Sequence, residues 1–215
     1  MINILSNNSS IISQYLRELR DVDIQQDRRK FENNLERLAL IAGYELSKQL
    51  QYASHQTTTP LAKINTPLLQ DQIVIATILR AGLPVQNGLH QVFDDAELAF
   101  VAAGRKPETA NGVEIDLAYV ATPELEGKVL IIGDTMLATG HSLIDCYKAL
   151  VAKGGVPSKA YIVAVIASQP GIDYVQMHLP EADITVAAID PKLNDSFFIV
   201  PGLGDAGDLL YGPKL

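Results

Sequence analysis

The sequence has one cysteine and no long hydrophobic run. Cys146 has no partner for a disulfide within the chain, so we expect a packed thiol and a reducing, cytoplasmic environment. No apolar run approaches the ~18 residues of a membrane-spanning helix, and residues 1–10 do not have the pattern of a signal peptide. We therefore expect no association with a membrane.

Positive charge is also scarce, because 17 Lys and Arg stand against 25 Asp and Glu, for a formal net charge of −8. A nucleic-acid surface needs a basic face, so we expect no nucleic-acid partner. A small anionic substrate needs only a few local arginines and is compatible with this charge. The 215 residues predict one domain. Its expected parts are a helical N-terminal part at 1–60, a core at 73–190 and a tail at 191–215.

A strand, an acid, a small-residue loop and a helix follow one another in the middle of the chain. The apolar run Val129–Ile132 leads to Asp134, and the loop Ala138–Gly140 precedes a segment of helical periodicity. Loop amides, the helix N-terminus and the hydroxyls of Thr139 and Ser142 would bind a phosphate. The alternative is an ordinary turn in which one of these hydroxyls caps the helix. Asp134 favours a ligand that carries hydroxyls and a cation, such as a sugar phosphate with magnesium.

Two other apolar strands also end at charged residues. Ile73–Leu79 leads directly to Arg80, and Leu98–Ala103 leads to Arg105. Strands that alternate with helices predict a mainly parallel sheet, whose sites lie at the carboxyl ends of the strands. Arg80, Arg105 and Asp134 all fall at such ends.

The remaining segments carry weaker patterns. Residues 1–10 are expected as a loose arm, or as an edge strand through Ile2, Ile4 and Leu5, and 54–60 as a polar break. The outer face of the first long helix is either solvated or a subunit contact. The other expected elements are helices at 27–51, 85–92 and 171–178, a flap-like hairpin strand at 113–120, and strands at 159–167 and 183–189.

The tail contains Gly202, Gly204 and Gly207 at the spacing of a dinucleotide-binding loop. We reject that interpretation, because we expect no helix after these glycines and too few residues remain for a βαβ unit. The glycines, with Asp205 and Asp208, indicate either a backbone that closely approaches a ligand or an exposed turn.

Three segments together resemble the uracil phosphoribosyltransferases, a type I phosphoribosyltransferase family. Ile78–Leu83 is similar to their pyrophosphate-binding loop, Asp134–Ser142 to their phosphoribosyl-diphosphate motif, and Phe198–Asp208 to their uracil-reading tail. The resemblance covers about two-thirds of the chain, and the tail is its most specific part. It implies an α/β fold with a mainly parallel sheet flanked by helices, a β-hairpin flap and a small C-terminal base-binding hood.

The resemblance also implies a reaction and a site. Ribose 5-phosphate would pass from phosphoribosyl diphosphate to uracil, giving UMP and diphosphate, with Mg²⁺ carried by the substrate and a homodimer as the assembly. The implied catalytic residues are Arg80, Arg105, Asp134 and Asp205. The implied contacts to phosphoribosyl diphosphate are these four and Thr135, Met136, Leu137, Ala138, Thr139, Gly140, His141 and Ser142, and the implied uracil contacts are Ile199, Gly204, Asp205 and Ala206.

The chain departs from the family pattern at two positions. Thr135 replaces a usual proline, which loosens the loop but adds an amide and a hydroxyl. His141 replaces a small residue, and we expect its ring to point outward, with a phosphate contact or crowding as alternatives. The segment 106–122 also diverges. Two other functions stay open, a non-catalytic sensor of nucleotides or phosphoribosyl diphosphate and a transferase for another base.

Overall fold

The computed structural model describes residues 1–105 and 115–213. Its strands are β1 (Ile2–Ile4), β2 (Tyr52–Thr58), β3 (Lys63–Leu69), β4 (Ile73–Leu79), β5 (Glu97–Arg105), β6 (Ile115–Ala121), β7 (Val129–Leu137), β8 (Lys159–Ser168), β9 (Asp183–Asp190), β10 (Lys192–Leu193) and β11 (Ile199–Val200). Its α-helices are α1 (Ile11–Arg20), α2 (Arg28–Ser47), α3 (Leu83–His90), α4 (His141–Gly154), α5 (Gln169–His178) and α6 (Ala206–Tyr211).

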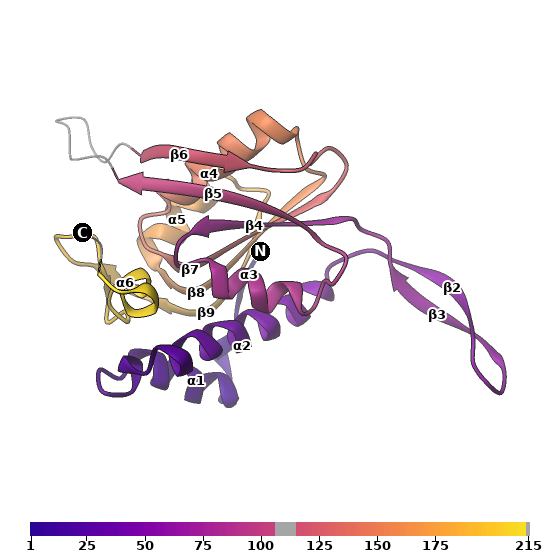
Figure 1. The fold of residues 1–215 in the computed structure, drawn as a ribbon, viewed down its shortest axis with the longest axis horizontal. Coiled ribbons are helices and arrows are strands. Elements are labelled where there is room, and N and C mark those ends of the chain that lie inside the picture. The colour runs from indigo at the N-terminus through magenta and orange to yellow at the C-terminus, as the bar shows by residue number, and fades with distance from the viewer. Residues whose placement is uncertain (106–114, 214–215) are drawn as a thin grey trace.

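Within the described residues, seven strands form one sheet in the order β1-β9-β8-β7-β4-β5-β6 (Figure 1). All neighbours pair in parallel except β6, which is antiparallel to β5. The predicted mainly parallel sheet is therefore confirmed. Of the two alternatives expected for residues 1–10, the edge strand is confirmed over β1 and the loose arm is wrong there, because Ile2 pairs with Ile184 and Ile4 with Val186 at the sheet edge.

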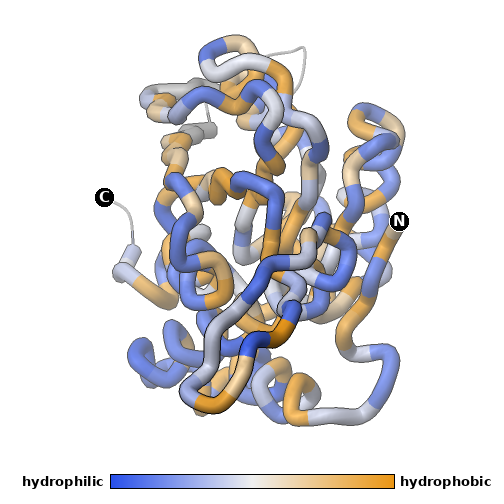
Figure 2. Tube along the Cα trace, turned by 90° about the vertical axis from the view of Figure 1, so that its right-hand side faces the viewer, coloured by the Kyte–Doolittle hydropathy of each residue, from blue (hydrophilic) through white to orange (hydrophobic). Residues whose placement is uncertain are grey.

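Helices cover both faces of the sheet, with α1, α2 and α3 on one face and α4 and α5 on the other (Figure 1). Side chains of a strand alternate between the two faces, so β4 contributes to two cores. Ile73 and Ile75 pack with the α1–α3 layer, while Val74 and Ala76 pack with the α4–α5 layer. Hydrophobic stretches accordingly run through the interior of the molecule (Figure 2).

The helix ends are set by local capping. Asp27 accepts a hydrogen bond from the Lys30 amide and so starts α2, while Gly155, with a φ of 91°, ends α4. The helix expected at 27–51 begins at Arg28 and ends earlier than expected, at Ser47. None of the helices in the described ranges is long and apolar enough to cross a membrane.

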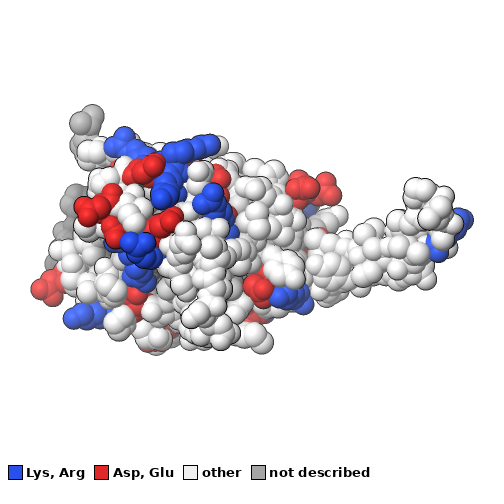
Figure 3. Space-filling view, turned by 90° about the horizontal axis from the view of Figure 1, so that it is seen from below, with Lys and Arg blue, Asp and Glu red and all other residues white. Residues whose placement is uncertain are grey.

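Strands β2 and β3 form an antiparallel arm that projects from the body (Figure 1). Their pairing runs from Tyr52 opposite Leu69 to Thr58 opposite Lys63, so the polar break expected at 54–60 is wrong over 54–58, while residues 59 and 60 lie in the turn between the strands. Both faces of the arm are largely exposed, which removes the apolar alternation by which a half-buried strand is recognised. Figure 3 shows the arm with few charged groups, and Lys63 is the one Lys, Arg, Asp or Glu among residues 52–69.

The C-terminal part forms a small hood beside the carboxyl ends of the strands. Strand β10 pairs antiparallel with β11, and α6 packs against α2. We predicted no helix after the tail glycines, and α6 contradicts this. Asp205 starts the short helix by accepting a hydrogen bond from the Asp208 amide. No strand follows α6 among the described residues, so the βαβ unit of a dinucleotide fold is still missing.

Candidate active site

A pocket of about 840 Å³ opens at the carboxyl ends of β4 and β7. Three separate segments supply most of its lining, which are the loop after β4, the segment from the end of β7 into α4, and the C-terminal hood; Ala102 of β5 also lines it. The lining residues of these three segments include Arg80, Ala81, Asp134, Met136, Leu137, Ala138, Thr139, Gly140, Ser142, Phe197, Ile199, Gly204, Asp205 and Ala206. The structure therefore brings together the three segments on which the family resemblance rests.

The loop after β4 carries Arg80 at the mouth of the pocket. A Cβ atom on Gly82 would lie 2.4 Å from Thr77 Oγ1 and 2.7 Å from the Ile78 carbonyl oxygen, so only glycine fits there. The Arg80 side chain is 40% exposed, and its Nη2 donates to Asp208 Oδ1 at 3.4 Å. Its guanidinium also lies 5.7 Å from the centre of the Tyr211 ring. A cation held at the pocket mouth by contacts this weak is available to an anionic ligand.

Asp134 lies within β7, whereas we expected it at the carboxyl end of that strand. The strand continues to Leu137, and Asp134 faces the pocket with only part of its surface exposed. Burial raises the pKa of its carboxyl to about 7, although backbone amides of Met136 and Thr135 oppose the shift. The amide of Thr135 donates to Asp134 Oδ1 at 2.7 Å. Asp134 is thus a partly protonated carboxyl near pH 7, ready to accept hydrogen bonds once it ionises.

Thr135 lies behind the pocket wall and is fully buried. Its hydroxyl donates to the Ala81 carbonyl oxygen at 2.6 Å, which ties β7 to the loop that carries Arg80. The resemblance implied that Thr135 contacts phosphoribosyl diphosphate. The structure instead directs its side chain to Ala81, so the hydroxyl supports the loop.

We expect Thr135→Val to raise the KM for phosphoribosyl diphosphate by a few fold and to cost about 1–3 kcal/mol of stability, because the Ala81 carbonyl loses its buried donor. Thr135→Ser keeps a hydroxyl and is the matched control. Steady-state kinetics and urea unfolding of both variants test this. Equal KM values for the valine and serine variants would contradict the role of the hydroxyl.

The loop Ala138–Gly140 leads into α4. Gly140 is the N-cap residue with a φ of 81°, and no side chain caps the helix, so the predicted alternative of a Thr139 or Ser142 cap is wrong. The loop is held from behind by Ser168, whose hydroxyl donates to the Ala138 carbonyl oxygen at 2.5 Å. Thr139, Gly140 and Ser142 all line the pocket. Their position at the N-terminus of a 14-residue helix suits a phosphate group.

His141 is exposed and its ring stacks on Tyr174, with ring centroids 4.0 Å apart. Tyr174 in turn stacks on His178 at the same separation. Neither His141 nor Tyr174 lines the pocket, so the histidine side chain points outward as expected.

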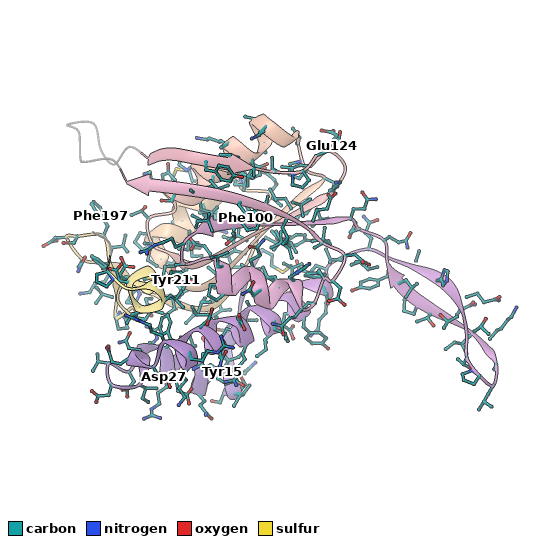
Figure 4. All side chains as sticks on the ribbon, viewed as in Figure 1. Tyr15, Asp27, Phe100, Glu124, Phe197 and Tyr211 are labelled. Atoms are coloured by element: carbon teal, nitrogen blue, oxygen red, sulfur yellow. The ribbon has the colours of Figure 1, made fainter. Side chains whose placement is uncertain are left out.

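The hood contributes Ile199, Gly204, Asp205 and Ala206 to the pocket. Ile199 and Ala206 are buried, which excludes the alternative of a wholly exposed turn. Phe197 also lines the pocket, and Figure 4 shows it at the end of the molecule where the hood lies.

Two further predictions concern residues beside the pocket. Arg105 ends β5, and its side chain lies outside the described part of the chain. The flap strand expected at 113–120 is present as β6 from Ile115 onward, while residues 106–114 are outside the described ranges. Cys146 is buried as expected, and burial raises the pKa of its thiol to about 12.

Comparison with known proteins identifies the family. A family model described as uracil phosphoribosyltransferase matches residues 6–213. The chain belongs to the uracil phosphoribosyltransferase family. It is 45% identical to the uracil phosphoribosyltransferase of Porphyromonas gingivalis over 98% of both chains, and 38% identical to that of Thermococcus gammatolerans over 97% of this chain and 92% of the other. The AQ2163 protein from Aquifex aeolicus, a solved structure, superposes with a TM-score of 0.88 at 32% identity, covering 99% of this chain and 98% of that one.

Sequence reasoning missed two residues that shape this uracil phosphoribosyltransferase site. Asp208 contacts Arg80, and nothing in the sequence indicates a contact across 128 residues. Ser168 both supports Ala138 and starts α5 by accepting a hydrogen bond from the Gly171 amide at 2.9 Å. Its capping role is readable from a serine directly after a buried strand, with Pro170 in the first turn. Its contact with Ala138 cannot be predicted from the sequence.

Proposed function

We propose that the protein transfers ribose 5-phosphate from phosphoribosyl diphosphate to N1 of uracil, giving UMP and diphosphate. The convergence of the Arg80 loop, the Asp134–Ser142 segment and the hood on one pocket is the observation that supports this function. In the reaction the bond from C1 of the ribose to the diphosphate oxygen breaks and a bond from C1 to N1 of uracil forms. The N1 proton leaves to solvent.

The sugar substrate binds across the strand ends. Arg80, and Arg105 from the end of β5, bind the diphosphate, Asp134 accepts hydrogen bonds from the ribose hydroxyls, and the amides and hydroxyls of Ala138–Ser142 hold the 5′-phosphate. Met136 and Leu137 line the pocket wall between Asp134 and the Ala138–Ser142 loop. Positioning and charge neutralisation of the leaving group lower the barrier of such a transfer, because its transition state is cationic at C1.

Uracil binds to the hood. Ile199, Gly204 and Ala206 present main-chain groups, and Asp205 lies between base and sugar. The edge of uracil offers an acceptor, a donor and an acceptor, whereas the edge of cytosine offers a donor, an acceptor and an acceptor. Cytosine would leave buried main-chain groups unpaired, and an unpaired buried polar group costs about 1–3 kcal/mol. This penalty selects uracil.

Magnesium belongs to this site through the substrate. No cluster of three or more His, Cys, Asp or Glu side chains able to hold a metal occurs among residues 1–105 and 115–213. Asp134 and Asp205 nevertheless both face the pocket, and Mg²⁺ in phosphate-binding sites commonly takes one or two carboxylates with the phosphate oxygens. Bound there, it would neutralise charge on the departing diphosphate.

One assay tests the function against its two alternatives. The purified protein receives phosphoribosyl diphosphate with Mg²⁺ and either uracil, cytosine, adenine or hypoxanthine, and nucleotide and diphosphate are measured. UMP from uracil alone, lost when a chelator removes the Mg²⁺, is the expected result. Nucleotide from another base would indicate a different transferase. Binding of phosphoribosyl diphosphate without turnover would indicate a sensor.

We propose in addition that the chain forms a single domain, and that the protein is cytoplasmic and assembles as a homodimer. The exposed apolar side chains of the β2–β3 arm support a subunit contact, since Leu61 is 97% exposed and Tyr52, Ile64 and Leu68 are also exposed. We expect a dimer in analytical ultracentrifugation and a monomer after Ile64→Glu with Leu68→Glu. The control is Met177→Glu, which places a charge at an exposed apolar position away from the arm. A monomeric wild type would contradict the proposal.

A further inference from the structure

An ion pair connects helix α1 with the end of β9, two elements that are far apart in the sequence. Arg20 Nη1 lies 2.8 Å from Asp190 Oδ2, and Arg20 Nη2 lies 2.8 Å from Asp190 Oδ1. The geometry is a two-pronged pair, which is the strongest arrangement of these groups. The two residues are separated by 170 positions in the chain.

The pair is largely withdrawn from solvent. The side chain of Asp190 is 7% exposed and that of Arg20 is 24% exposed. Loss of either partner would leave the other charge uncompensated in a poorly solvated place, which is far more costly than loss of an exposed pair. The exposed pair on the same helix, between Arg17 and Asp21 at 3.9 Å, provides the contrast.

Both members of the pair also bind the backbone of Gly202. Arg20 Nη1 donates to the Gly202 carbonyl oxygen at 3.0 Å, and the Gly202 amide donates to Asp190 Oδ2 at 2.9 Å. Gly202 has a φ of 61°, and a Cβ atom there would lie 2.1 Å from the Ile199 carbonyl oxygen. The conformation of this residue is therefore set by one ion pair that satisfies both of its polar groups.

Gly202 lies between Ile199 and Gly204, two of the three residues proposed to present main-chain groups to uracil. Main-chain recognition works only if these groups are held in place, and the short β11 pairs with only two residues of β10. We propose that Arg20 and Asp190 are positioning residues that hold the hood in its base-binding conformation and thereby set affinity and selectivity for the base. This inference rests on the proposed function.

Apparent affinity falls in proportion to the fraction of molecules whose site is in the binding conformation. We expect Asp190→Asn, which keeps the size of the side chain and removes its charge, to raise the KM for uracil by about tenfold or more. The KM for phosphoribosyl diphosphate should change by less than about threefold, because the Arg80 loop and the 138–142 loop do not depend on the pair. The preference for uracil over cytosine should fall.

Two further variants and a second measurement sharpen the test. Arg20→Lys keeps the charge but lacks the planar fork whose two nitrogens pair with Asp190, and it should give a smaller rise in the KM for uracil. Arg17→Gln on the same helix should leave both KM values unchanged. Hydrogen exchange of the free protein should be faster over residues 199–208 in Asp190→Asn and in Arg20→Lys, and unchanged over β7 and β8.

The outcomes separate the inference from the proposed function. A wild type that makes no UMP from uracil overturns the proposed function, and exchange over 199–208 then still decides whether the pair holds the hood. An active wild type whose folded variants keep the KM for uracil overturns the inference. Equal rises in both KM values, or a loss of stability with unchanged KM values, also overturn it, because they indicate a purely structural pair. If Asp190→Asn does not fold, Arg20→Lys alone decides by the same criteria.

Discussion

Replacing Arg80 with alanine is expected to lower kcat/KM for phosphoribosyl diphosphate by about tenfold to a few hundredfold, because one charged contact worth about 1.5–3 kcal/mol is lost. The structure predicts that this loss appears without unfolding. Arg80 is 40% exposed, and its carboxylate contact with Asp208 is long at 3.4 Å. Exposed ion pairs contribute about 0–1 kcal/mol, so the stability should hardly change.

Arg29 provides a matched control for this experiment. It is another exposed arginine, with Glu32 as its carboxylate partner at 3.1 Å, and it lies outside the pocket. Steady-state kinetics of Arg80→Ala and Arg29→Ala, each with its urea unfolding curve, should show a loss of activity only in the first. Wild-type rates in a folded Arg80→Ala variant would remove this arginine from the site.

Replacing Asp134 with asparagine is expected to reduce activity on the order of a hundredfold or more and to stabilise the protein near neutral pH. Activity falls because the two charge-assisted hydrogen bonds that we propose between Asp134 and the ribose hydroxyls, each about 1.5–3 kcal/mol, are weakened. The fold should persist, since an asparagine oxygen can still accept from the Thr135 amide that now bonds to Asp134. Thermal unfolding and kinetics on the same preparation measure both effects.

The stabilisation should depend on pH in a defined direction. The pKa of Asp134 in the folded protein is raised to about 7, so the folded state holds a proton that the unfolded state has released between about pH 4 and pH 7. The wild type therefore loses stability as pH rises through this window, by on the order of 2–4 kcal/mol. The asparagine variant has no such group and keeps its stability.

Urea unfolding at pH 5 and pH 8 checks the sign. The free energy of unfolding of Asp134→Asn minus that of the wild type should be larger at pH 8 than at pH 5. Cys146→Ala serves as a control for changes in the nearby core, because its thiol does not titrate in this range. If the free energies of unfolding of Asp134→Asn and the wild type differ by the same amount at both pH values, burial does not raise the pKa of the Asp134 carboxyl.

Patterns of several consecutive residues allowed most of the core to be predicted. Ala160–Ala167 and, apart from Thr77, Ile73–Leu79 are apolar, and a strand buried on both faces needs such a run. Elements without a one-sided pattern were misjudged. The β2–β3 arm is exposed on both faces, and β7 continues past Asp134 to Leu137, with Asp134 facing the pocket and Thr135 buried behind it. Helix α1 was not predicted, although Ile12, Leu16 and Leu19 have helical spacing and are buried.

The sequence by itself determined the kind of site, one that binds a sugar phosphate at the carboxyl ends of strands. The reason is that glycines, hydroxyls and charged residues near the ends of buried strands are local features, which can be recognised without knowing how the elements pack. Which groups support which loop was decided only by the tertiary structure. The bonds from Thr135 to Ala81, from Ser168 to Ala138 and from Arg20 to Asp190 join segments that are 30 to 170 positions apart. Such pairings depend on the order of strands in the sheet and on how helices pack over it, and no short stretch of sequence contains that information.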